Sequence, residues 1–473
     1  MAEAKKTVKK TTKTTKDTKK EVNNVFRSFD YDNIPIVDLV NEMITDAFQK
    51  RASDIHFDPT PTTLKVRIRI DGELISYAEV PEIVKKNLST RIKIIAGMNI
   101  TETRLPQDGA IKMEFDGKPI DMRVSSLPIV DGEKIVIRIL DYSRSLEGLE
   151  TLGFTKENLE TVYNILKVPN GIILVTGATG SGKSTTVYSM LQRINKISTN
   201  IITVEDPVEM KISGLNQVQV MSDIGLTFAN TLRSILRQDP DIIMIGEIRD
   251  DETARIAVRA SITGHLVLST IHTNNSLNTI ERLLDMDVER YLLGTALTGI
   301  VSQRLTKRLC PKCRKKRKTT EYEKIVFKKA LNRDVEEIYE PVGCNECIGG
   351  YLGRIPIHEV LELNQEIRDA IVNNVRKDEL RELVYNKTKV KTLLEDGLIK
   401  VLNGDTSFEE VLRVIDVEED FGDADSEIKN AILGKLKEDD LKKETSKQVE
   451  ENEETLDTLE ETLEEEKTDY EVL

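Results

Sequence analysis

The chain has 473 residues, of which 39% are hydrophobic and 32% are charged, and its formal net charge is −14. No apolar run approaches the roughly 18 residues that span a bilayer, and no apolar segment follows the Lys/Thr-rich N-terminus. The sequence therefore excludes a transmembrane helix and a secretory signal. It favours a cytoplasmic protein of two or three domains that reaches a membrane only through a partner.

The negative charge is concentrated at the C-terminus. Residues 416–473 contain 23 acidic and 7 basic residues, a net charge of −16, so residues 1–415 carry about +2. Such a tail repels phosphate and argues against a nucleic-acid role. We expect this acidic tail to be mostly disordered. We expect the same of the Lys/Thr-rich arm, residues 1–24, which has too few apolar side chains to fold alone.

Residues 25–150 have the pattern of a small α/β domain. Apolar residues recur at helical spacing between Ile36 and Phe48. Residues 64–70 then alternate apolar and basic side chains, which predicts a strand, and Asp71-Gly72 is typical of a hairpin turn. Shorter strands are expected at 121–124 and 134–140.

From residue 151 to about 300, apolar strands alternate with helices, which indicates a mostly parallel sheet. The predicted buried strands are 172–175, 201–204, 242–245 and 266–269. In open α/β sheets the site lies at the carboxyl ends of the strands. Beyond this core, residues 301–360 hold the cysteines, and residues 361–415 are expected to form a helical subdomain.

A glycine-rich segment follows the first of these strands. Residues 177–184 fit the pattern G-x-x-x-x-G-K-[ST] at every fixed position, between a strand and a predicted helix. Backbone N–H groups of such a loop surround phosphate oxygens, Lys183 neutralises the β- and γ-phosphates, and the Ser184 hydroxyl ligates Mg²⁺. The sequence therefore predicts an ATP site formed by Gly177, Ala178, Thr179, Gly180, Ser181, Gly182, Lys183, Ser184 and Thr185.

Carboxylates follow two of the neighbouring strands. Glu205 and Asp206 come directly after 201–204, and Glu247 follows 242–245 and Gly246. An ATPase of this kind needs one carboxylate for Mg²⁺ and one that orients the attacking water. We assign Glu247 to the water and Glu205 to Mg²⁺ or its waters. The alternative is that one of them caps a helix or pairs with Arg249.

Two of the four histidines flank the next predicted strand. His265 precedes this strand and His272 follows it. Histidine can hydrogen-bond a γ-phosphate or respond to its loss. Both are therefore candidate catalytic residues, and the alternative is that either one is an ordinary core side chain.

The cysteines form two close pairs. Cys310 and Cys313 are separated by two residues, as are Cys344 and Cys347, with thirty residues between the pairs. This spacing predicts a closed, structural Cys₄ zinc site. The alternatives are four thiols without metal or a pair of disulfides.

Together these segments resemble the secretion ATPase superfamily, specifically the assembly ATPases of type IV pili and type II secretion. The resemblance covers residues 34–415, including segments that look like the family's Walker A, Asp box, Walker B and His box. Like the family, the chain has Gly246-Glu247 at Walker B. Other matching segments include Ala52–His56, Arg104–Gly109 and Gln303-Arg-Leu305.

The resemblance implies a RecA-like P-loop core, a smaller PAS-like α/β domain before it, an inserted zinc module and a helical C-terminal subdomain. It also implies a homo-hexamer that drives a polytopic inner-membrane platform protein, and through it pilin-like subunits. Ring ATPases deliver arginines to the nucleotide from another domain or subunit. Our candidates are Arg104, Arg123 and Arg138, with Arg233 and Arg237 as the alternative pair.

A second hypothesis is that the chain is a P-loop ATPase that acts on nucleic acid, with the zinc module in contact with DNA. The basic run Arg314–Lys318 near the cysteines supports this reading, although such runs are more often solvated. The sequence also leaves open whether the motor serves pilus extension, protein secretion or DNA uptake.

Overall fold

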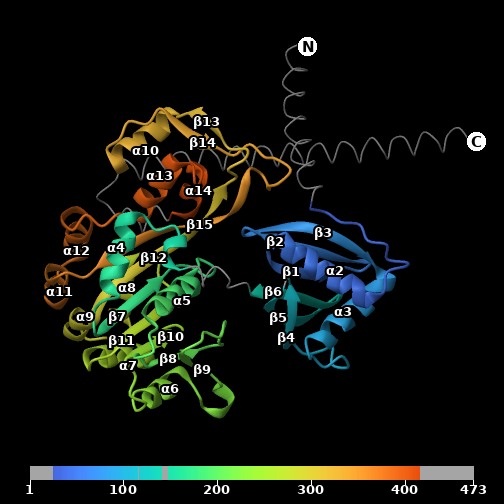
Figure 1. Ribbon diagram of the computed structural model, residues 1–473, viewed down its shortest axis with the longest axis horizontal. Helices are drawn as coiled ribbons and strands as arrows, with labels where there is room; N and C mark the ends of the chain where they lie inside the picture. Colours follow the sequence, from blue (N-terminus) through green and yellow to red (C-terminus); the bar gives the residue numbers. More distant parts are fainter. Residues whose placement is uncertain (1–24, 116, 141–147, 416–473) are drawn as a thin grey trace, which may run out of the picture. The chain divides into compact units, whose positions relative to one another are not determined.

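The computed structural model describes residues 25–115, 117–140 and 148–415 (Figure 1). The predictions for the N-terminal arm and the acidic tail lie outside these residues. Residues Lys318–Glu337 belong to a second compact unit, separate from the two sheet domains.

The first domain contains a six-stranded antiparallel sheet with the order β3-β2-β1-β6-β5-β4. Its strands are β1 (Ala52–Pro59), β2 (Thr63–Ile70), β3 (Glu73–Pro81), β4 (Gln107–Phe115), β5 (Lys118–Ile129) and β6 (Gly132–Leu140). Two helices, α2 (Ile36–Gln49) and α3 (Glu82–Ile95), share one apolar core with this sheet. The α/β character expected for this segment is thus present.

The alternating pattern of β2 explains why only one face of this sheet joins the core. Successive side chains of a strand point to opposite faces. Val66 and Ile68 are therefore buried, whereas Arg67 lies on the other face. At the end of β2, Asp71 and Gly72 both have positive φ, at 50° and 95°, as a two-residue type I′ hairpin turn requires.

The second domain contains a seven-stranded sheet with the order β15-β12-β7-β11-β10-β8-β9 (Figure 1). Its strands are β7 (Gly171–Thr176), β8 (Ile201–Glu205), β9 (Leu215–Gln219), β10 (Ile242–Ile245), β11 (Leu266–Ile271), β12 (Leu297–Leu309) and β15 (Tyr351–Glu362). All neighbours are parallel except the antiparallel pair β12 and β15. The four predicted core strands are confirmed, and all four are buried throughout.

Helices cover both faces of this sheet, because its strands are apolar on both sides. Along β7, Ile172 and Leu174 join one apolar cluster, whereas Ile173 and Val175 join another. The second cluster includes side chains of α4 (Lys156–Ile165) and α5 (Lys183–Ile194). The first cluster includes side chains of α6 (Phe228–Ile235), α7 (Asp251–Ile262), α8 (Ser276–Asp285), α9 (Arg290–Ala296) and α11 (Gln365–Val372). The core is therefore an α/β fold with a mostly parallel sheet, as expected, and it has helices on both faces of that sheet.

In the part of the chain that the structure describes, six more helical elements lie outside the second compact unit. They are the 3₁₀ helices η2 (Leu149–Thr151) and η3 (Ser222–Ile224), the π-helix η4 (Glu382–Lys387), and the α-helices α12 (Lys377–Arg381), α13 (Leu393–Asn403) and α14 (Phe408–Val414). The predicted helical character of residues 361–415 is thus present. In the second compact unit, α10 (Glu321–Leu331) begins with a capping box formed by Thr320 and Glu323.

The zinc module is less separate than the sequence suggested. The expected boundaries at 300 and 360 fall inside β12 and β15, which belong to the seven-stranded sheet. Residues 310–350 connect these two strands and include the pair β13 (Lys315–Lys318) and β14 (Glu337–Glu340). The cysteines therefore lie at one end of an antiparallel ribbon that is continuous with the core sheet.

Candidate active site and metal centre

The phosphate loop connects β7 to α5. Gly180 and Gly182 have φ values of 78° and 92°, a region that side-chain-bearing residues rarely adopt. The backbone can therefore turn sharply before α5 begins at Lys183, with Gly182 as its N-cap. Ser184 lies exposed in the first turn of this helix, where its hydroxyl is available to a ligand. This is the local geometry that anion binding at a helix N-terminus requires.

Lys183 is held inside the loop that it is expected to serve. Its side-chain Nζ donates to the carbonyl oxygens of Gly177 (2.8 Å) and Ala178 (3.1 Å), and it lies 3.4 Å from Nδ1 of His272. Burial lowers the pKa of Lys183, and the charge of Glu247 opposes this shift. The amine is thus positioned for phosphate by the backbone of the loop itself.

Glu247 lies across from the loop, after the end of β10. Its Oε2 is 3.4 Å from Nε2 of His272, and its Oε1 accepts a short hydrogen bond from Arg249. The hydrogen bond from Arg249 lowers the pKa of Glu247, and the charges of His272 and Lys183 act in the same direction. Burial lowers the pKa of His272, and the charge of Lys183 reinforces this effect. A carboxylate and a neutral imidazole therefore stand beside the loop lysine.

The structure brings three predicted residues together at one edge of the sheet, namely Lys183, Glu247 and His272. The carboxyl ends of β7, β10 and β11 meet at this edge, because these strands are parallel and in register. Arg249 also reaches Asp206, at 3.7 Å, and so connects the segments after β8 and β10. The sequence indicated Arg249 only as an ion-pair partner of a carboxylate, and its spacing of two residues from Glu247 was the available signal.

Glu205 occupies a different environment from the one expected. Only 3% of the residue is exposed. Its Oε2 accepts a hydrogen bond from Tyr188 of α5, and its Oε1 accepts from Thr203 and Gln217. Because protein donors hold both oxygens, Glu205 anchors the helix that follows the phosphate loop to β8. A role of Glu205 toward Mg²⁺ or its waters therefore stays a prediction.

His265 lies away from the site, so it is not positioned for the catalytic role that the sequence predicted. It precedes β11, whereas the loop follows β7, and Leu266 pairs with Gly171 at the start of that strand. Parallel strands place preceding and following residues at opposite edges of a sheet. The Nδ1 of His265 lies 2.9 Å from the carbonyl oxygen of Ala260 near the end of α7. This contact gives His265 a structural role.

Two of the three arginine candidates of the first domain make ion pairs within that domain. Arg104 pairs with Glu102 at 2.9 Å, and Arg138 pairs with Asp54 at 2.9 Å. Arg123 lies directly opposite Arg138 in the β5–β6 register, so both project from the same face of the sheet. Which of them contacts nucleotide stays a prediction.

The alternative arginines lie on or just after α6. Arg233 pairs with Glu252 of α7. Arg237 donates to the carbonyl oxygen of Arg233 at 2.8 Å. Both sets of contacts are typical of surface ion pairs and helix ends.

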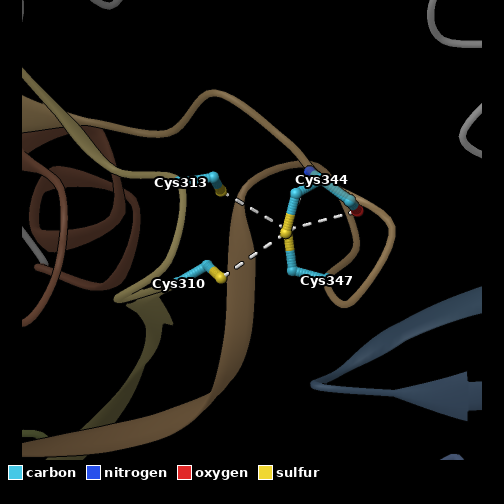
Figure 2. Close-up of side chains that lie close together, drawn as sticks. All are labelled: Cys310, Cys313, Cys344 and Cys347. Atoms are coloured by element: carbon cyan, nitrogen blue, oxygen red, sulfur yellow. Dashed lines mark hydrogen bonds between the residues drawn. The ribbon is translucent and has the colours of Figure 1, made fainter.

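The four cysteines converge, as Figure 2 shows. Their Sγ atoms all lie within 4.8 Å of one another. Sulfur–sulfur distances are 3.9 Å for Cys310–Cys344, 3.6 Å for Cys313–Cys347 and 3.5 Å for Cys344–Cys347. A tetrahedral zinc ion with Zn–S bonds of about 2.3 Å separates its sulfurs by about 3.8 Å.

The donor set therefore fits Zn²⁺ in both number and spacing. All four thiols are free of disulfide bonds, which is the form a metal requires. In addition, the backbone N–H of Cys344 points at Sγ of Cys347, at 3.3 Å. Such N–H donors support thiolate charge around a metal. These four residues could hold one ion with no coordination position left open.

A phosphate loop at the end of a parallel strand, facing a carboxylate and a histidine on neighbouring strands, defines a P-loop ATPase. Residues 30–413 match the family model described as Type II/IV secretion system protein. The chain therefore belongs to the type II/IV secretion system protein family, and its activity is ATP hydrolysis.

Two relatives illustrate the similarity. A putative type II secretion system protein E of Escherichia coli (strain K12) is 46% identical over 381 residues, covering 80% of this chain and 77% of the relative. The type IV pilus assembly ATPase PilB of Myxococcus xanthus is 44% identical over 385 residues, covering 80% of this chain and 68% of the relative. The resemblance inferred from the sequence motifs is thus confirmed.

Two solved structures share the fold. The pilus retraction motor PilT with bound ADP matches with a TM-score of 0.55 and 27% identity, covering 81% of this chain and 97% of that one. The Legionella pneumophila ATPase DotB matches with a TM-score of 0.60 and 22% identity, covering 80% of this chain and 95% of that one. Among the described residues, no helix has both the length and the apolar character to cross a bilayer.

Proposed function

We propose that this chain is a hexameric motor that couples ATP hydrolysis to the assembly of a type IV pilus or a type II secretion pseudopilus. The observation that carries this proposal is the convergence of Lys183, Glu247 and His272 at one edge of the sheet. Similarity to relatives named for type II secretion and type IV pilus assembly supports the choice of system.

Each residue of this site has a proposed role. Lys183 would bind the β- and γ-phosphates, and Ser184 would ligate Mg²⁺, which would neutralise phosphate charge. Glu247 orients the attacking water, and its low pKa keeps it a carboxylate at neutral pH. His272 hydrogen-bonds Glu247 through Nε2, and its Nδ1 holds the amine of Lys183 beside the phosphates. Glu205 supports the Mg²⁺ site indirectly, by holding Tyr188 of α5.

The arginines of the first domain, the zinc site and the membrane partner have proposed roles in the hexamer. Arg104, Arg123 and Arg138 of the first domain would approach nucleotide bound to the second domain, of the same or a neighbouring subunit. Zinc in the Cys₄ site would be structural, because four thiolates close its coordination shell. The membrane partner would be a polytopic platform protein at the cytoplasmic face of the inner membrane, which passes the motion on to pilin-like subunits.

The nucleic-acid reading has less support. Within the basic run, Arg317 makes ion pairs with Glu340 at 3.6 Å and with Glu409 at 3.0 Å. Neutralised arginine is less available to phosphate, and phosphate contacts dominate affinity for nucleic acid. The Lys315–Lys318 strand is therefore expected to contribute little to DNA binding.

The test compares two effectors on the ATP turnover of the purified chain. The cytoplasmic domain of the platform protein from the same gene cluster should stimulate turnover, and double-stranded DNA should not. Stimulation by DNA that fades steeply with rising salt, and none by the platform domain, would replace this proposal with the nucleic-acid one.

A further inference from the structure

One buried polar side chain beside the phosphate loop has no role in the site described so far. Gln303 lies on β12, and only 1% of it is exposed. In the β12–β7 register, Ser302 lies opposite Thr176, the last residue of β7. Gln303 therefore comes one position beyond the end of β7, level with the start of the loop.

The side-chain amide of Gln303 connects two parts of the phosphate-binding segment. Its Nε2 donates to the carbonyl oxygen of Ser181, at 2.7 Å, inside the loop. Its Oε1 accepts from the hydroxyl of Thr186, at 2.8 Å, in the first turn of α5. One amide thus fixes the end of the loop relative to the helix whose N-terminus receives phosphate.

Gln303 also packs against both ends of the loop. A Cβ atom built on Gly177 would lie 2.3 Å from the carbonyl oxygen of Gln303, and one built on Gly182 would lie 3.1 Å from its Nε2. A side chain at Gly177 is therefore excluded by the backbone of Gln303. The loop is shaped by contact with β12 as well as by its own glycines.

We propose that Gln303 is a positioning residue that holds the phosphate loop in its nucleotide-binding conformation. The inference rests on the proposed ATP site and adds a residue that touches no reacting atom. Its physical basis is pre-organisation. Loop amides that are already oriented lose less conformational freedom when phosphate binds. Without the amide, the Ser181 carbonyl and the Thr186 hydroxyl lose their hydrogen-bond partner in a buried site. The loop can then adopt other backbone conformations.

The test measures ADP affinity with a fluorescent ADP analogue and Mg²⁺, using Gln303→Leu, Gln303→Glu and Thr186→Val. Gln303→Leu removes both hydrogen bonds. Gln303→Glu keeps the acceptor for Thr186 but turns an oxygen toward the Ser181 carbonyl. We expect the Kd for the ADP analogue to rise about tenfold in both Gln303 variants, and to rise less in Thr186→Val. The matched control is Gln365→Leu, which removes an exposed glutamine that donates to Asp369 on α11.

The rise in unfolding temperature caused by ADP distinguishes an effect on ADP binding from an effect on stability alone. At a fixed ADP concentration c, ADP stabilises the folded protein by RT ln(1 + c/Kd), so tighter binding raises the unfolding temperature further. The Gln303 variants should gain less from ADP than wild type and the Gln365 control, whatever their melting temperature without nucleotide. If Gln303→Leu does not fold, Gln303→Glu and Thr186→Val decide the outcome.

An unchanged Kd in the folded variants would overturn the inference. That result would leave the proposed function intact, because wild type would still bind and hydrolyse ATP. Failure of wild type itself to bind ADP would instead overturn the proposed function. The two outcomes are therefore distinguishable in the same titration.

Discussion

The imidazole of His272 lies between Lys183 and Glu247, with Nδ1 3.4 Å from the lysine amine and Nε2 3.4 Å from the carboxylate. A neutral imidazole has one donor and one acceptor nitrogen. The tautomer that fits accepts from Lys183 and donates to Glu247. The lowered pKa of His272 keeps the ring in this neutral form at physiological pH.

Replacing His272 should therefore slow turnover more than it weakens binding. We expect His272→Gln to lower kcat about 10- to 100-fold, because hydrogen bonds to charged groups are lost at the site of hydrolysis. Steady-state ATPase assays and ADP titration would measure the two effects separately. His265→Gln is the matched control, since His265 lies at the opposite edge of the sheet. Equal losses in the two variants would contradict this assignment.

The buried histidine of the second domain predicts an acid-sensitive fold. His358 is fully buried and stacks on Phe154, with ring centroids 3.8 Å apart. Its backbone N–H donates to Asp396, which also accepts from the amine of Lys400. Burial, and secondarily the charge of Lys400, lowers the pKa of His358 well below its usual value.

The sign follows from proton uptake by the unfolded chain. Below pH ~6.5 the unfolded imidazole binds a proton that the folded one excludes, so the free energy of unfolding falls as pH falls. We expect His358→Phe to reduce this slope by up to ~1.4 kcal/mol per pH unit. The pKa values of His56 and His272 are also lowered, so these two residues should account for part of the slope that remains. Urea unfolding between pH 7.5 and 5.5 measures it, and an unchanged slope would refute the prediction.

Removing metal should destabilise the ribbon formed by β12 and β15. The purified chain should contain one zinc ion per subunit, measured by atomic spectroscopy. Structural zinc contributes binding energy directly to folding, on the order of 10 kcal/mol in small zinc domains. A chelator, or Cys344→Ser, should therefore lower the unfolding temperature. Protein without zinc, with melting unchanged by chelator, would show that the four thiols serve another purpose.

The sequence predicted those parts of the molecule that depend on local pattern. The loop around Lys183 and the four cysteines are contiguous motifs, and the buried strands are short apolar runs. Each carries its chemistry in its own spacing, so the structure confirmed the strands and brought the cysteines together.

The rest depended on tertiary neighbours. His265 and His272 flank the same strand, and only the direction of β11 in the sheet separates their roles. Glu205 accepts a hydrogen bond from Tyr188, seventeen residues away in the chain. Gln303 contacts a loop that lies more than a hundred residues before it. No local pattern encodes these contacts, because they arise from packing between elements distant in the chain.

The most direct test of the account is ATP turnover by Glu247→Gln, which keeps the shape of the side chain and removes its charge. We predict that kcat falls at least about 100-fold while ADP binding stays within a few-fold of wild type. The matched control, Glu252→Gln, changes a surface carboxylate of α7 that pairs with Arg233 and should retain turnover. Undiminished turnover in Glu247→Gln would contradict the claim that hydrolysis occurs between Lys183 and Glu247.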